Sequence, residues 1–73
     1  MTTTLDFDLR GDHIALGALL KASGLASSGG AVKPMLASGE VTVNGEAESR
    51  RGRKLRAGDE IAVGTQRVRI RAA

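Results

Sequence analysis

The sequence predicts an α+β fold in which two short helices pack on a small, mostly antiparallel sheet. Apolar residues alternate with charged residues near both ends of the chain, which is the spacing of half-buried strands. Between these segments, leucines recur at the spacing that places them on one face of a helix. The chain has 73 residues, enough for one domain, and we expect a single domain over residues 1–73.

The first strand is predicted near the N-terminus, where Leu5, Phe7 and Leu9 alternate with charged residues. Gly11-Asp12 is a turn signal, because glycine and aspartate both tolerate the backbone angles of tight turns. We expect His13-Ile14 to return in extended form after that turn.

The first helix is predicted from Leu16, Leu19 and Leu20, which are spaced to share one helical face. Lys21 falls in its last turn, where a cation suits the negative end of the helix dipole. Gly24 is expected to end the helix as the residue after its C-cap.

A second helix is predicted over residues 30–38. Ser27 or Ser28 would accept hydrogen bonds from its free N-terminal N–H groups. Pro34 is costly inside a helix, so we expect the helix to start late enough to place this proline in the first turn. The residues expected to face the core are Ala31, Val32, Met35 and Leu36.

Two hairpins are predicted after the helices. Asn44-Gly45 lies between two short segments of strand character, which favours a two-residue type I′ turn. Ala57-Gly58-Asp59 is a further turn, and Gly64-Thr65 joins the strands of a closing hairpin. In the last strand we expect Val68 and Ile70 to point inward.

Charge is distributed unevenly along the chain. Residues 1–49 sum to −3 and residues 50–73 to +6. Five cations lie between Arg50 and Arg56 with no acid among them, and Gly52 within this run predicts an exposed loop. Such asymmetry favours an anionic partner, nucleic acid first and a membrane surface second, over a face that only confers solubility.

A resemblance to a known family rests on three segments in order. The segments read "LLKASGLA", "SGGAVKPML" and "SGEVTVNGEAESRRGRKLRAGDEI", and the resemblance extends over about residues 14–61, about two thirds of the chain. This combination resembles the RNA-binding domain first described in ribosomal protein S-four, also called the alpha-L motif. The free-standing small bacterial members of that family are the most similar.

The resemblance implies a non-catalytic protein that grips structured RNA, ribosomal or transfer RNA, through two helices and the adjoining hairpin. Two departures from the family pattern are Gly29, where many members have arginine, and Pro34, where an ordinary helix former is usual. Carried over by position, with the loop cations included, the RNA-binding set is Lys21, Ser28, Gly29, Gly30, Lys33, Arg50, Arg51, Arg53, Lys54 and Arg56.

The residues give part of this reading independent support. A helix N-terminus carries free N–H donors and partial positive charge, and Gly29 and Gly30 lack side chains that would hold a phosphate away. The alternative is that this segment is only a capped, flexible linker. Arginine in the loop favours recognition of phosphates by a planar guanidinium fork. Arg67, Arg69 and Arg71 form an exposed face, and the sequence leaves their contact with RNA open.

The missing residue types narrow the function. Phe7 is the only aromatic residue, so the chain lacks the stacking platform of proteins that bind splayed single-stranded bases. Recognition of RNA shape and backbone is therefore expected. There is no cysteine, and His13 is the only histidine, so we expect no metal, no cofactor, no small-molecule substrate and no catalysis.

The expected setting is the cytoplasm, because no apolar run is long enough to span a bilayer and no signal peptide is evident. The protein is expected to act as a monomer without membrane contact, with structured RNA and the ribosome as partners. The alternative function is a small adaptor that docks an acidic protein through the basic loop.

Overall fold

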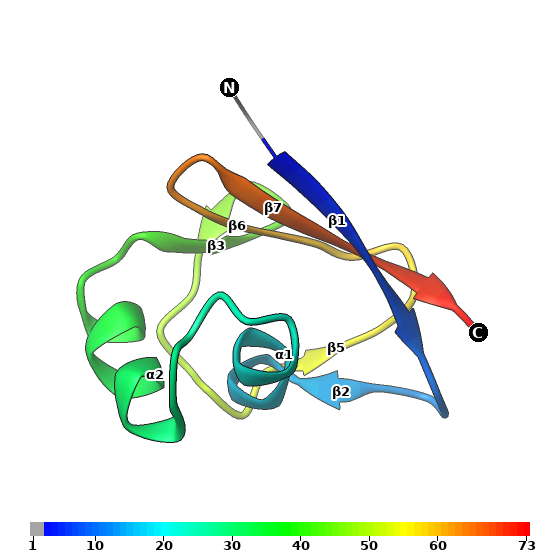
Figure 1. The fold of residues 1–73 in the computed structure, drawn as a ribbon, viewed down its shortest axis with the longest axis horizontal. Helices are drawn as coiled ribbons and strands as arrows, with labels where there is room; N and C mark the ends of the chain where they lie inside the picture. Colours follow the sequence, from blue (N-terminus) through cyan, green and yellow to red (C-terminus); the bar gives the residue numbers. More distant parts are fainter. Residues whose placement is uncertain (1–2) are drawn as a thin grey trace.

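The computed structural model describes residues 3–73, and in them the expected α+β architecture is confirmed. Two helices lie on one side of a five-stranded sheet, and a separate two-stranded ribbon runs beside the first helix (Figure 1). In chain order the elements are β1 (Thr3–Leu9), β2 (Ile14–Ala15), α1 (Leu16–Ala22), α2 (Gly29–Ala37), β3 (Val41–Val43), β4 (Glu46–Ala47), β5 (Lys54–Leu55), β6 (Glu60–Val63) and β7 (Gln66–Ala72).

The large sheet has the strand order β1-β7-β6-β3-β4. Its neighbours are antiparallel except for β1 and β7, which run parallel with Thr3 opposite Gln66 and Leu9 opposite Ala72. The first and last strands of the described chain therefore lie side by side, with Thr3 and Ala72 at opposite ends of the pair.

The strand after the Gly11-Asp12 turn is extended, as expected, but it does not return along β1. Instead β2 pairs with β5, with Ile14 opposite Leu55. This pairing corrects the prediction that residues 50–56 form one exposed loop. Leu55 of β5 is fully buried, and the chain becomes exposed again at Arg56.

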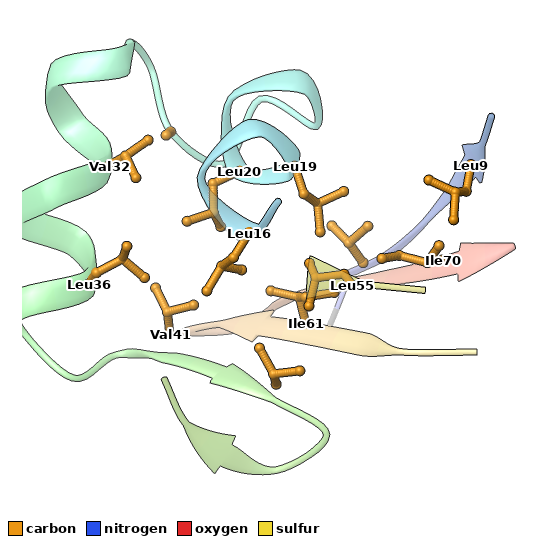
Figure 2. Close-up of a cluster of buried hydrophobic side chains, with 13 residues drawn as sticks. Leu9, Leu16, Leu19, Leu20, Val32, Leu36, Val41, Leu55, Ile61 and Ile70 are labelled. Carbon is orange, nitrogen blue, oxygen red and sulfur yellow. The ribbon is translucent and has the colours of Figure 1, made fainter. Parts of the chain in front are cut away.

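The core lies between the helices and the sheet (Figure 2). Leu16, Leu19 and Leu20 of α1 are all 0% exposed, which confirms that they share the buried face of this helix. The buried hydrophobic residues are Leu9, Leu16, Leu19, Leu20, Ala26, Val32, Leu36, Val41, Val43, Leu55, Ile61, Val68 and Ile70.

The first helix ends as the sequence predicts. Its C-cap is Ser23, whose N–H donates to the carbonyl of Leu19 at 2.9 Å. Gly24 follows with a φ of 82°, in the left-handed region where a residue without a Cβ meets no steric penalty. Lys21 lies in the last turn, as expected.

The second helix begins and ends one residue earlier than predicted, and two details of the prediction were wrong. Ser28 is the N-cap residue, but its side chain makes no capping hydrogen bond. Pro34 lies in the second turn of α2 rather than the first. It has no N–H to donate to the carbonyl of Gly30, so this helix keeps an internal interruption.

Only two of the four residues of α2 that were predicted to face the core are buried. Val32 and Leu36 are buried, whereas Ala31 and Met35 are half-buried and pack at the edge of the core. Because residues four apart lie on the same helical face, the two pairs form neighbouring stripes. The first of these stripes points directly at α1 and β3 (Figure 2).

The predicted turns between strands are confirmed. Asn44 and Gly45 have φ values of 53° and 88°, as a type I′ turn requires. The Asn44 side chain also donates to Asp59 at 3.0 Å and accepts from the N–H of Glu60 at 2.9 Å. The hairpin tip is thus tied to the start of β6.

The alternating pattern of β1 proved only partly correct. Leu9 is buried and Phe7 half-buried, but Leu5 is 40% exposed. β1 is an edge strand, and its first half lies away from the helices (Figure 1). The alternation of apolar and charged residues therefore spans residues 5–9, but burial of the apolar side chains begins only at Phe7.

Two general findings concern residues 3–73. None of their helices combines the length and apolar character needed to cross a membrane. No three or more histidine, cysteine, aspartate or glutamate side chains among them are grouped so as to hold a metal ion.

Candidate nucleic-acid interface

The first part of the basic run forms a tight turn, Arg50–Arg53, which we call the basic turn. The N–H of Arg53 donates to the carbonyl of Arg50 at 3.2 Å and closes it. Arg51 and Gly52 lie at its tip and are exposed. In Figure 1 this yellow-green segment passes below α1 and next to α2.

A single carboxylate holds both ends of the basic turn. Glu48 is only 8% exposed and is the one charged residue buried within residues 3–73. Its Oε2 accepts from the backbone N–H of Ser49 at 3.0 Å and of Arg50 at 3.1 Å. The Arg50 side chain donates to both carboxylate oxygens, and Arg53 Nη1 donates to Oε1 at 3.1 Å.

These donors set the protonation state of Glu48. Hydrogen bonds from the Arg50 side chain, the Arg50 backbone and the Arg53 side chain lower the pKa of this carboxyl from 4.5 to about 2. Burial acts in the opposite direction but is the weaker effect. Glu48 is therefore ionised at neutral pH. Its negative charge offsets part of the positive charge of Arg50 and Arg53, which the sequence analysis had assigned to an exposed loop.

The basic turn also caps the first helix. The N–H groups of Leu16 and Gly17 donate to the carbonyls of Arg53 and Arg51, both at 2.8 Å. The N-cap residue Ala15 has no side-chain donor or acceptor for this purpose, and no acid lies in the first turn. Main-chain carbonyls of the turn thus satisfy amides that a capping side chain usually satisfies.

Gly17 allows this close approach. A Cβ at this position would lie 3.3 Å from the Arg51 Cβ, 3.4 Å from the Arg51 carbonyl oxygen and 3.5 Å from Val32 Cγ1. The first two contacts are with the basic turn and the third is with α2. The absence of a side chain at Gly17 therefore lets the turn and both helices meet at one point.

The meeting point is an open hollow that contains residues from all three segments. Lys21 of α1, Gly29 of α2 and Arg51 of the basic turn line it together. Arg51 also lines an adjoining hollow with Lys33 of α2 and Ser49. We call Lys21, Gly29, Lys33 and Arg51 the basic corner.

The cations of the basic corner have no acidic partner in the described part of the chain. Among residues 3–73, every ion pair within 4.0 Å involves other cations. Lys21, Lys33 and Arg51 are exposed, so their full positive charge faces the hollow and solvent. This corner offers what phosphate groups require, which is several cations around an accessible concave surface.

The structure brings most of the predicted RNA-binding residues together. Ser28 and Gly30 flank Gly29 at the start of α2, and both are exposed. Arg50, Arg53 and Lys54 line a further hollow with Gly52. These residues continue the corner along the turn into β5.

Two predicted features differ from this arrangement. Arg56 lines a separate hollow with Arg10 and the residues that end β1 and β7, so it is not part of the basic corner. Arg50 and Arg53 are 75% and 32% exposed, but both guanidinium groups are engaged by Glu48. The run of five cations is therefore divided by the fold into free and paired members.

The arginines of the last strand are exposed, as predicted, but all are paired; we call Arg67, Arg69 and Arg71 the arginine strand. Arg67 and Arg69 approach Glu60 at 2.8 and 3.5 Å, and Arg71 approaches Asp8 at 2.9 Å. The Arg67 hydrogen bond is the main cause that lowers the pKa of Glu60. Acids on neighbouring strands thus offset this cationic face.

Sequence reasoning missed Glu48 and Gly17. An acid directly before a run of cations was the available signal for Glu48, because buried carboxylates need several charge-assisted donors. For Gly17 the signal was a glycine within a helix, which is unfavourable unless a neighbour must approach closely.

The fold is that of an RNA-binding class of protein. The S4 domain family matches residues 7–71, and the chain belongs to this family, whose members share an RNA-binding fold of the alpha-L type. The family resemblance inferred from the sequence is thereby confirmed.

The chain is also similar to the probable ribosome maturation protein RlbA of Bacillus subtilis (strain 168). The two are 46% identical over 52 residues, which cover 71% of this chain and 73% of the relative.

Proposed function

We propose that this protein binds structured RNA, ribosomal RNA in preference to transfer RNA, and takes part in ribosome maturation without catalysing a reaction. The observation that carries the proposal is the basic corner, where Lys21, Lys33 and Arg51 converge with no acidic partner among residues 3–73. The likeness to a probable ribosome maturation protein supports the choice of ribosomal RNA. We further propose that it acts as a monomeric single domain in the cytoplasm.

The corner is suited to phosphates because its charges come from three separate segments. One phosphate would meet Arg51 and Lys21 beside the exposed Gly29 backbone, and a neighbouring phosphate would meet Lys33. Phosphate contacts fix the position of a protein on a nucleic acid but carry little sequence information. The contact set therefore favours recognition of a folded RNA by the placement of its backbone.

Ser28, Gly30, Arg50, Arg53 and Lys54 would extend this interface on either side. Lys54 makes no ion pair with any residue that the structure describes, whereas the guanidinium groups of Arg50 and Arg53 would remain partly accessible beside Glu48. We place Arg56 at the margin, because it lines a different hollow.

The proposal is tested by crosslinking a tagged copy of the protein to RNA in bacterial cells and sequencing the attached RNA. We expect ribosomal RNA segments to be enriched over an untagged control, and a variant with Arg51 changed to Ala to recover less of them. Recovery of a protein partner that survives nuclease treatment, with no enriched RNA, would favour the adaptor and contradict the proposal.

A further inference from the structure

Glu48 occupies an unexpected place for an acid, since it lies directly beneath the basic turn at the proposed RNA interface. It binds the side chain and backbone of the first residue of the turn and the side chain of the last. Arg51, at the tip between them, has no such restraint on its own side chain. The carboxylate therefore fixes the frame from which the Arg51 side chain projects.

We propose that Glu48 is a positioning residue for RNA binding: it holds the basic turn against α1 so that Arg51 lies in the basic corner. This inference rests on the proposed function. For the change in RNA affinity on removal of Glu48, positioning and net charge predict opposite directions. Removal of a negative charge next to the site should strengthen RNA binding if only net charge matters. If Glu48 acts by positioning, its removal weakens binding.

The contacts explain why a neutral substitute fails. Oε1 and Oε2 of Glu48 both accept from guanidinium groups, and Oε2 also accepts from two backbone N–H groups. Glutamine keeps one oxygen and replaces the other with an NH₂ donor, which faces guanidinium donors and repels them. The Glu48→Gln change thus releases one end of the turn with little change in side-chain size.

The same turn is restrained on its other side by α1. The carbonyls of Arg51 and Arg53 accept from Gly17 and Leu16, so a loosened turn also loses its register on the helix. The loss is directly observable, because both amides would exchange faster with solvent. Amide exchange at Leu16 and Gly17 therefore reports the position of the turn independently of RNA.

The experiment compares Glu48→Gln with Glu46→Gln, using purified bacterial ribosomal RNA and measuring Kd on the full chain. Glu46 is an exposed acid on the same hairpin, with no ion pair or side-chain hydrogen bond among residues 3–73. Both changes raise the net charge by one. We expect Glu48→Gln to weaken binding about tenfold, and Glu46→Gln to leave it unchanged or up to about twofold tighter. Equal or tighter binding by Glu48→Gln would overturn the proposal.

A double-mutant cycle separates positioning from a general loss of stability. If Glu48 acts through Arg51, Arg51→Ala weakens binding less in the Glu48→Gln background than in the wild type. In Glu48→Gln, the slope of log Kd against log salt concentration should also decrease by about one, which corresponds to the loss of one phosphate contact. Additive effects and an unchanged salt slope would assign Glu48 a purely structural role.

A second variant keeps the test decisive if Glu48→Gln does not fold. Arg53→Lys retains the positive charge, but the lysine side chain is one bond shorter and does not reach the position from which Nη1 donates to Oε1; Arg69→Lys on β7 is its matched control. We expect Arg53→Lys to weaken binding about threefold, non-additively with Arg51→Ala, while Arg69→Lys binds as the wild type does. Wild-type affinity in Arg53→Lys would contradict the proposal. Failure of the wild type itself to bind ribosomal RNA would instead reject the proposed function.

Discussion

The basic corner and the arginine strand each present three cations, yet they differ in the acids that surround them. Cations of the corner come from two helices and a turn and have no ion-pair partner among residues 3–73. Each cation of the arginine strand is paired with a carboxylate of β1 or β6. Equal numbers of cations thus produce an electropositive surface in one place and a neutralised one in the other.

Strand register explains the difference. Arg69 lies opposite Asp6 of β1 and opposite Glu60 of β6, and Arg71 lies opposite Asp8. Acids and cations on neighbouring strands of a sheet are close enough to interact. The acid that precedes the basic turn, Glu48, is instead buried and engaged by the ends of the turn. Its position leaves the tip of the turn free.

The largest expected effect comes from removing each set of three cations. We expect Lys21→Ala, Lys33→Ala and Arg51→Ala together to weaken ribosomal RNA binding roughly 100-fold, since each charge-assisted contact contributes on the order of 1 kcal/mol. Changing the three residues of the arginine strand to alanine removes the same charge, and we expect less than about a fivefold loss. Filter-binding titrations at one salt concentration measure both. Similar losses would show that net charge, rather than location, controls affinity.

The next effect concerns the junction that holds the corner together. Gly17→Val should destabilise the fold by about 1–3 kcal/mol, because its side chain would meet Arg51 and Val32, which lie within 3.5 Å of the added Cβ alone. Helix propensity by itself would slightly favour valine over glycine. Urea unfolding of this variant and of Ala22→Val, an exposed control on α1, tests the expectation. Equal stabilities would mean that the turn yields without cost.

A third expectation uses the pKa of Glu48, which is about 2 in the folded chain and 4.5 ordinarily. A pKa lowered by folding means that the ionised group stabilises the folded state fully above pH 4.5 and loses this effect as the pH falls towards 2. The stability difference between wild type and Glu48→Gln should therefore be constant above pH 4.5 and shrink below it. Chemical denaturation across this pH range measures the difference. A difference that does not change with pH would show that the carboxylate charge is not responsible.

The smallest expected effect is on the neutralised face. Glu60→Gln removes the carboxylate shared by Arg67 and Arg69, whose exposed ion pairs contribute less than about 1 kcal/mol each. We expect RNA affinity to change less than about twofold, because these arginines lie outside the basic corner. Tenfold tighter binding would indicate that the arginine strand joins the interface once its acid is removed.

Local signals explain why much of the fold was predictable. The leucines of α1, the glycine that ends this helix and the Asn44-Gly45 turn each depend on residues close in the sequence. Helical periodicity and turn geometry are local properties, so they can be recognised without knowing the rest of the fold. The position of Pro34 in α2 was predicted wrongly because the cost of a proline inside a helix is a local property. In the folded chain, burial of Val32 and Leu36 stabilises a helix that starts at Gly29 and places Pro34 in its second turn.

By itself, the sequence determined the fold class, the family and the residue types that face RNA in the proposal, since these follow from short-range spacing and from motif order. Only the tertiary structure decided which cations are free. Pairing between β1 and β7 joins residues more than sixty positions apart in the chain, as the Arg71–Asp8 contact does. Electrostatic screening and pairing act across space, so the charge of a surface depends on neighbours that sequence order does not reveal.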